Sequence, residues 1–359
     1  MVSSPPPQKR HPPAKPPRAG APPGSAGHRG ALWRAALALV LVAAGALIPL
    51  LGPSAVLRGT GEAAPPALEG VGLLRGFMFA ALSVHLGDLF VSRLTRRVPG
   101  APCAAPRDWA PVAAWVGVLA SLGLASVVAT GNLVPHRLAD MDIGGLYRTR
   151  DGALALVEVN AFVVAGACAL SRRAGTAVLP LAAVVVAESL RAHPEQGTSL
   201  LGAALTFVHL TCGALWTGGL LQVLRLLWAW RRVPGAGGAG AVLLGRYARI
   251  AGYLLAVLTV TGVLSALRRM PPGTVIDQLG TTAYGRTLLA KVVLVGAVAL
   301  LALVARRSSR PARRLGAGAA VPPDDVAGAF APARAEVVGL GAVVMVSGLL
   351  TALPLPIRW

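Results

Sequence analysis

Long apolar segments separated by short polar loops are the feature that most constrains what this chain can fold into. A helix needs about 20 mainly apolar residues to cross the roughly 30 Å hydrocarbon core of a bilayer. Segments that reach or approach this length are Leu32–Leu51, Val71–Val91, Pro111–Thr130, Gly152–Leu170, Thr176–Leu190, Ser199–Trp228, Arg246–Leu267, Tyr284–Ala305 and Ala335–Leu353. The sequence therefore predicts a polytopic membrane protein with about nine spans.

The apolar residues come in continuous runs, and the alternation at every second residue that marks a membrane β-barrel is absent. The chain is 55% hydrophobic and only 13% charged. Its many Ala and Gly residues suit helices that approach one another closely. We predict an all-α fold, a bundle of transmembrane helices.

The N-terminal region has two interpretations. Residues 1–30 are rich in Pro, Gly and basic residues, which predicts a disordered cytoplasmic tail. The apolar segment 32–51 is longer than the core of a signal peptide, which is about 7 to 15 residues, and we expect it to remain as a transmembrane helix. The alternative is cleavage near Glu62-Ala63-Ala64, which would leave eight spans.

A formal net charge of +20 would suggest a nucleic-acid partner in a soluble protein. Here the basic residues follow the loops: the tail and every second loop carry 19 Lys and Arg, and the alternate loops and the C-terminal end carry 8. The positive-inside rule then places the N-terminus in the cytoplasm and the C-terminus outside. The expected partner is the lipid bilayer, and no nucleic acid is predicted.

The sixth apolar segment contains two possible metal donors, a histidine and a cysteine, with a tryptophan close by. His209, Cys212 and Trp216 are spaced three and four residues apart, so they share one helical face. Nitrogen and sulfur donors favour a soft ion such as Cu(I). The structural alternative is a His hydrogen-bonded to a neighbouring helix, with Cys and Trp in packing contacts.

His85 and Asp88 form a second candidate pair, three residues apart within the second segment. Ionisable groups inside a span are costly and commonly functional. The pair suits a metal ligand with a carboxylate that orients it, and it equally suits a structural ion pair.

Glu188 and His193 stand at the outer end of the fifth segment, where a cation arriving from outside would enter. The alternative is an interfacial carboxylate and a loop histidine in water. Glu158 and Lys291 are further ionisable residues within spans, and we expect Lys291 to reach the interface or to pair with Glu158 or Asp88. No nucleophile–base arrangement or Walker motif is present, so no enzymatic activity is predicted.

The second half of the chain resembles the copper-resistance D family, the CopD/PcoD-like membrane proteins. The resemblance is carried by His209 with the run ALWTGG, by RYARIAGYLLAVLTVTGVLSAL, by LGTTAYGRTLLAKVVL and by the final segment AEVVGLGAVVMVSGLLTALPLP. It covers roughly residues 185–356. It implies N-terminal membrane helices over 31–184 followed by a CopD-like membrane domain over 185–359.

The resemblance also implies an inner-membrane protein concerned with copper uptake or tolerance, and a separate periplasmic CopC-type copper-binding protein as partner. The residues Tyr284, Gly285, Arg286 and Lys291, which match the family motif, are expected to be structural or gating, and so is Trp216 in the ALWTGG run.

These observations predict copper transport or copper handling, with copper passing from Glu188 and His193 to His209, Cys212 and His85. One alternative is a copper-insertion partner of a respiratory oxidase that binds copper without transporting it. Another is a haem-binding electron carrier with His85 and His209 as axial ligands.

Overall fold

The computed structural model describes residues 45, 47–131, 133, 137–171, 173–192, 199–270, 272–308 and 323–353. Of residues 138, 199, 303–308 and 323–336 it describes the backbone only.

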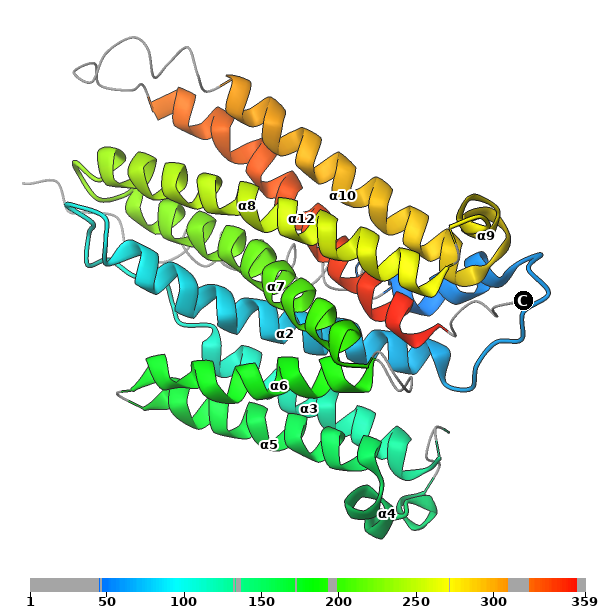
Figure 1. Cartoon of the computed structure of the whole chain (residues 1–359). Helices are drawn as coiled ribbons and strands as arrows, with labels where there is room; N and C mark the ends of the chain where they lie inside the picture. Colours follow the sequence, from blue (N-terminus) through cyan, green and yellow to red (C-terminus); the bar gives the residue numbers. More distant parts are fainter. Residues whose placement is uncertain are drawn as a thin grey trace, which may run out of the picture. The chain divides into compact units, whose positions relative to one another are not determined.

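Every regular element in this part of the chain is helical, as predicted (Figure 1). The long helices are α2 (Leu68–Thr95), α3 (Ala110–Ala129), α5 (Arg150–Leu170), α6 (Val178–Arg191), α7 (Ser199–Trp230), α8 (Gly237–Arg269), α10 (Ala283–Ser308) and α12 (Pro323–Ala352). Shorter elements are a helix over Leu47–Leu57, η1 (Leu138–Asp140), α4 (Ile143–Arg148), η2 (Ala174–Ala177) and α9 (Val275–Thr281).

Seven helices in the described residues are long and apolar enough to cross a membrane, which confirms a multi-span protein. They are α2, α3, α5, η2 together with α6, α7, α8 and α10. The predicted first span, 32–51, lies mostly outside the described residues. The last corresponds to α12, whose described apolar part, Val337–Ala352, is short. The total of nine spans therefore stays a prediction.

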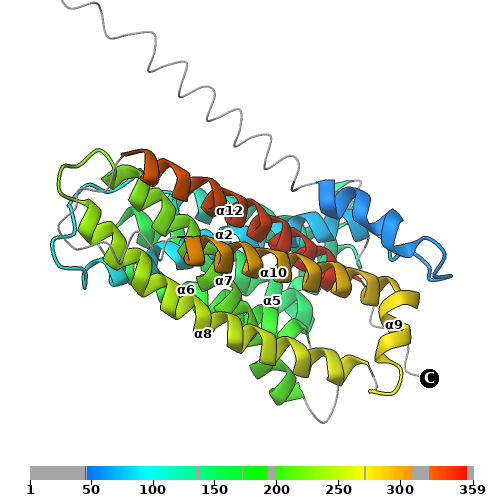
Figure 2. The same ribbon diagram turned by 90° about the horizontal axis from the view of Figure 1, so that it is seen from above.

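Helix α2 lies at the centre of the helix contacts, against α3, α7 and α12 (Figures 1 and 2). On one side α3, α5 and α6 continue the bundle, and on the other α7 packs on α8 while α12 packs on α10. The apolar cores follow the same division, because one cluster joins α2 to α3, α5 and α6, and another joins the C-terminal half of α2 to α7 and α8. Residues on α2 thus contact both groups of helices.

Glycine sets the contact between α2 and α7. A Cβ added to Gly218 would overlap the carbonyl oxygen of Ser83, and one added to Gly87 would overlap the backbone of Gly218. The two backbones therefore touch at this level, as expected for small residues at membrane helix crossings. The neighbouring Gly219 faces side chains instead, because a Cβ there would lie 2.8 Å from the ring of Tyr247 and 3.3 Å from that of Phe90.

Other contacts repeat this use of small residues. Gly348 of α12 faces the backbone of α2 so closely that a Cβ would lie 2.5 Å from the amide nitrogen of Gly76. On α3, Gly117 provides the space for Phe162 of α5, which is fully buried. Burial of an aromatic ring against a glycine maximises van der Waals contact where the hydrophobic effect between helices is weak.

Candidate functional site

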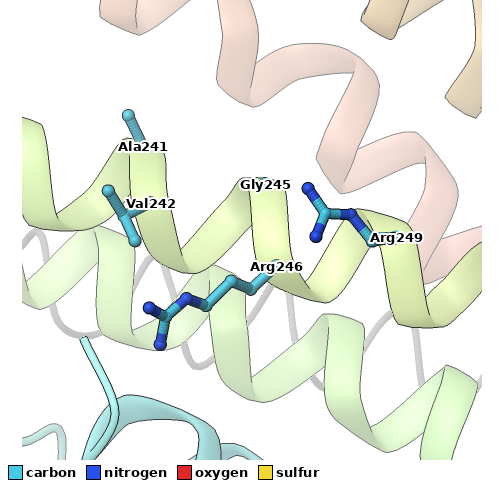
Figure 3. Close-up of a pocket in the computed structure, with 5 residues that line it drawn as sticks. All are labelled: Ala241, Val242, Gly245, Arg246 and Arg249. Atoms are coloured by element: carbon cyan, nitrogen blue, oxygen red, sulfur yellow. The ribbon is translucent and has the colours of Figure 1, made fainter.

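Two hollows in the surface are lined largely by helix α8, and they lie away from the predicted metal ligands. The first is lined by Ala241, Val242, Gly245, Arg246 and Arg249 (Figure 3). The predicted ligands that lie among the described residues are instead within helices α2, α6 and α7.

Among the predicted ligands that the structure describes, His85 is the most buried, with a relative exposure of 1%. It projects from α2 close to the Gly87–Gly218 contact, where the backbones of α2 and α7 meet. Its Nδ1 is buried and has no hydrogen-bond partner in the described part of the chain. A buried polar atom without a partner costs about 1–3 kcal/mol, so this nitrogen is available to a ligand.

Asp88 lies one turn further along α2 and belongs to a different set of contacts. The charged side chains that act on it are Asp108 and Arg225. Arg225 of α7 donates to the amide oxygen of Gln222 at 2.6 Å and stacks 3.7 Å above the ring of Trp109. These charges act on Asp88 without a direct pair, since the ion pairs of the described residues do not include it. Nδ1 of His85 has no hydrogen-bond partner among these residues, so it does not bind Asp88.

His209 is half-buried on α7 and is held by helix α8. Its Nδ1 lies 2.9 Å from the hydroxyl oxygen of Thr261. Thr261 also donates to the carbonyl oxygen of Val257, at 2.8 Å. The charged groups that act on His209 are the cations Lys291 and Arg269. Lys291 pairs with neither Glu158 nor Asp88, since the ion pairs of the described residues are those of Arg191 with Glu158 and with Glu188.

His85 and His209 lie at different levels of the bundle. Gly218, which meets α2 between Ser83 and Gly87, is nine residues after His209. At a rise of 1.5 Å per residue, His209 is roughly 13 Å from the level of His85 along the helices. A single ion, or a single haem, cannot be bound by both imidazoles in this arrangement.

The described residues contain no group of three or more His, Cys, Asp or Glu side chains that would hold a metal ion. Cys212 is a half-buried free thiol one turn after His209, and Trp216 is buried in the core between α7 and α8. The backbone carbonyl of Trp216 accepts a hydrogen bond of 2.6 Å from Tyr247, which secures the packing of α7 on α8. His193 lies outside the described residues.

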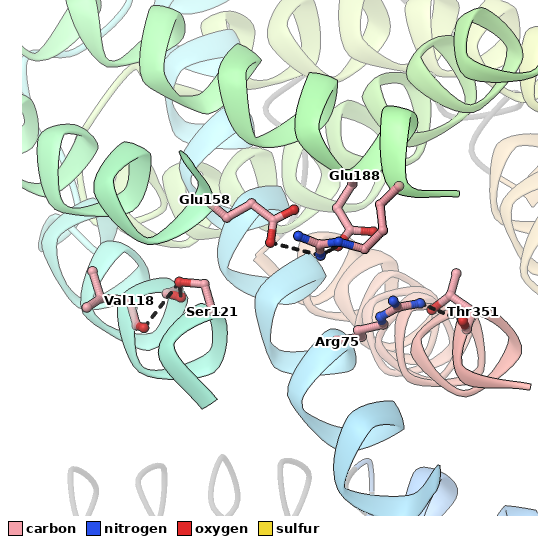
Figure 4. Close-up of polar contacts among 8 residues, drawn as sticks. Arg75, Val118, Ser121, Glu158, Glu188 and Thr351 are labelled. Carbon is pink, nitrogen blue, oxygen red and sulfur yellow. Dashed lines mark hydrogen bonds and ion pairs between the residues drawn. The ribbon is translucent and has the colours of Figure 1, made fainter. Parts of the chain in front are cut away.

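Glu188 is buried, and its carboxylate already forms an ion pair with the guanidinium group of Arg191. Nη1 of Arg191 donates to Glu188 at 2.8 Å and to Glu158 of α5 at 3.0 Å (Figure 4). The two carboxylates therefore lie within about 6 Å of each other. Sequence reasoning did not identify Arg191 as the partner, although its position three residues after Glu188 places both on one helical face.

This cluster reaches across the bundle towards the C-terminal helix. Arg75 of α2 acts electrostatically on Glu158 and donates to the carbonyl oxygen of Thr351 on α12, at 2.5 Å (Figure 4). One carboxylate oxygen of Glu158, which is fully buried, has no partner among the described residues.

The motif residues of α10 make structural contacts. The hydroxyl of Tyr284 accepts a hydrogen bond of 2.7 Å from Arg269. A Cβ at Gly285 would overlap the carbonyl oxygen of Gln278 in α9. Arg286 donates to the carbonyl oxygens of Gly280 at 2.8 Å and Arg58 at 2.6 Å, so it joins α9 and α10 to the segment before α2.

Residues 241–351 match the profile of the family described as Copper resistance protein D. The chain carries a domain of this family. The match spans nearly all of α8, then α9 and α10, and α12 as far as Thr351, and it is shorter than the 185–356 expected from the sequence. No curated protein and no solved structure matches the chain. The CopD match implies a role in copper resistance or copper handling. His209 precedes the CopD domain, and its partner Thr261 lies within it.

Proposed function

We propose that this protein transports copper across the cytoplasmic membrane and thereby contributes to copper homeostasis or resistance. The observation that carries the proposal is the CopD domain in a chain whose described residues contain seven candidate spans. The contact between His209 and Thr261 supports it, because it joins an imidazole within the bundle to that domain.

His85 is proposed as the copper ligand near the middle of α2. Imidazole nitrogen binds copper well, and the unpartnered Nδ1 of His85 gives it a free donor. The close contact of α2 and α7 at Gly218 fixes the position of this histidine. Because the ring is almost fully buried, copper would exchange its hydration shell for protein ligands on reaching it.

His209, with Cys212 one turn later, is proposed as a separate and transient stop for the ion. A copper ion on His209 would experience the positive charges of Lys291 and Arg269. Such a site releases its ion readily, and conduction requires binding that is weak enough for the ion to leave. A pathway therefore fits these two separated histidines better than a storage site does.

Glu188 and His193 are proposed to receive copper at the extracytoplasmic face, from a separate CopC-type chain. Since Arg191 already binds Glu188, copper would have to displace this guanidinium. Asp88 is proposed to influence copper through its negative charge near α7, because the structure gives it Arg225 and Asp108 as electrostatic neighbours.

The copper content of the purified protein tests these ligands. We expect copper bound by the wild type, and at least roughly tenfold weaker binding in His85→Ala, since even the loss of a residue that only orients a ligand costs about 10–100-fold. His209→Ala should bind copper more weakly as well. The matched control is His28→Ala, near the N-terminus and outside the described residues, which should retain wild-type binding.

Elemental analysis of the four proteins after equilibration with Cu(I) gives the copper bound per chain. Equal copper content in all four would contradict the assignment of His85 and His209. A copper-insertion partner of a respiratory oxidase would also lose copper in these variants, and the measurement of flux separates it from a transporter.

A further inference from the structure

The two hollows on α8 adjoin each other and share two arginines. They have volumes of about 530 and 430 Å³. Both are lined by Arg246 and Arg249, and the second extends to Leu94 and Arg97 at the C-terminal end of α2. Arg246 and Arg249 thus line both hollows, and Arg97 adds a third guanidinium group to the second.

Among the described residues, these three arginines have no carboxylate partner. The ion pairs of the described residues involve only Arg191 with Glu158 and Glu188. Arg246 donates to the backbone carbonyl of Arg97, which holds α8 to the end of α2 without reducing the positive charge. In Figure 3 the side chains of Arg246 and Arg249 leave α8 on different sides and flank Gly245. The region carries an unbalanced positive charge, which favours an anion.

The rest of the lining is apolar, and the apolar surface continues along α8. Ala241, Val242 and Ile250 contribute to the hollows. Beyond Arg249 the helix exposes large apolar side chains at spacings of three and four residues, which are Tyr253, Val257, Val260 and Leu264. A molecule with an anionic head group and an apolar tail could thus contact arginines with its head and exposed apolar side chains with its tail, both on helix α8.

We propose that the hollow around Arg97, Arg246 and Arg249 binds the phosphate headgroup of an anionic phospholipid, with an acyl chain along the exposed face of α8. Basic pockets between membrane helices on the cytoplasmic side bind anionic headgroups. The arginine distribution predicts that this end of the bundle faces the cytoplasm. The proposal does not depend on copper transport.

Lipid binding can be measured on the full-length protein, purified and kept in a neutral detergent. The ligands are phosphatidylglycerol, phosphatidylcholine with the same acyl chains, and inorganic phosphate. Native mass spectrometry counts the bound lipid, and thermal denaturation reports stabilisation by each ligand. We expect the wild type to bind phosphatidylglycerol in preference to phosphatidylcholine, and to be stabilised by phosphatidylglycerol and not by inorganic phosphate.

The double variant Arg246→Gln/Arg249→Gln should bind phosphatidylglycerol at least about tenfold more weakly, because each basic residue near an anionic lipid contributes to binding. The matched control is Arg231→Gln/Arg232→Gln, which removes two exposed charges just after α7, where both arginines stack on Trp228. This control should keep wild-type affinity.

Three results would overturn the proposal. Equal binding by the wild type and the Arg246/Arg249 variant would show that the hollow does not bind lipid. An equal loss in the control would indicate general charge attraction. An equal response to inorganic phosphate and to phosphatidylglycerol would indicate a site for free anions.

Discussion

Replacing Gly218 by alanine is expected to destabilise the protein by about 3 kcal/mol or more, the upper end of the range for overpacking a well-packed core. The added methyl group would overlap the carbonyl oxygen of Ser83 on α2. That oxygen belongs to the backbone, so no side-chain rotation relieves the overlap, and α2 and α7 must separate. The separation would also disturb His85, which lies at this contact. Thermal denaturation in detergent, with the yield of monodisperse protein, measures the effect.

The control for this substitution is Gly252→Ala on α8. A Cβ at Gly252 meets nothing within 4 Å, and alanine is about 1 kcal/mol more favourable than glycine within a helix. We expect Gly252→Ala to keep or raise the midpoint of denaturation, while Gly218→Ala lowers it. Similar midpoints for the two variants would contradict the close contact of α2 and α7.

Replacing Arg191, which forms ion pairs with both Glu158 and Glu188, is expected to destabilise the protein by a similar amount. Arg191→Met would leave two buried carboxylates within about 6 Å of each other without their shared guanidinium. Breaking a buried ion pair by removing one partner costs about 3–5 kcal/mol. The same denaturation measurement reports the loss, and α5 and α6 are the helices whose packing should weaken.

The cause can be separated from the loss of packing by a second set of variants. Adding Glu158→Gln and Glu188→Gln to Arg191→Met removes the uncompensated charges and should restore a large part of the lost stability. The control Arg148→Met replaces an exposed arginine at the end of α4 and should have little effect. No recovery in the triple variant would mean that the charges of the two glutamates are not the cause.

The helices of the bundle follow from the sequence because the bilayer imposes both their length and their composition. The predicted segments 71–91 and 111–130 correspond to α2 and α3, whose ends extend or shift by a few residues. The apolar runs show where the hydrocarbon region lies, but helices continue beyond it into the interface. Helix α8 begins at Gly237, nine residues before the predicted Arg246, because the Gly- and Ala-rich loop continues the helix.

The side-chain contacts could be predicted only in part. The rule that an ionisable residue within a span needs a partner applied to Glu158, but the partner proved to be Arg191 and not Lys291. Helical spacing predicts neighbours along one helix, and it contains no information about which helices meet. The same limit applies to His85 and His209, because their separation depends on how α2 and α7 are aligned at Gly218.

The most direct test of the proposed function is copper flux into proteoliposomes that contain the purified protein. Wild-type protein should move copper across the bilayer down an imposed gradient, and the double variant His85→Ala/His209→Ala should lose this flux while it retains wild-type thermal stability. Flux in the double variant equal to that of the wild type would contradict the histidine pathway. Copper binding by the wild type without any flux would contradict transport and favour a copper-insertion partner.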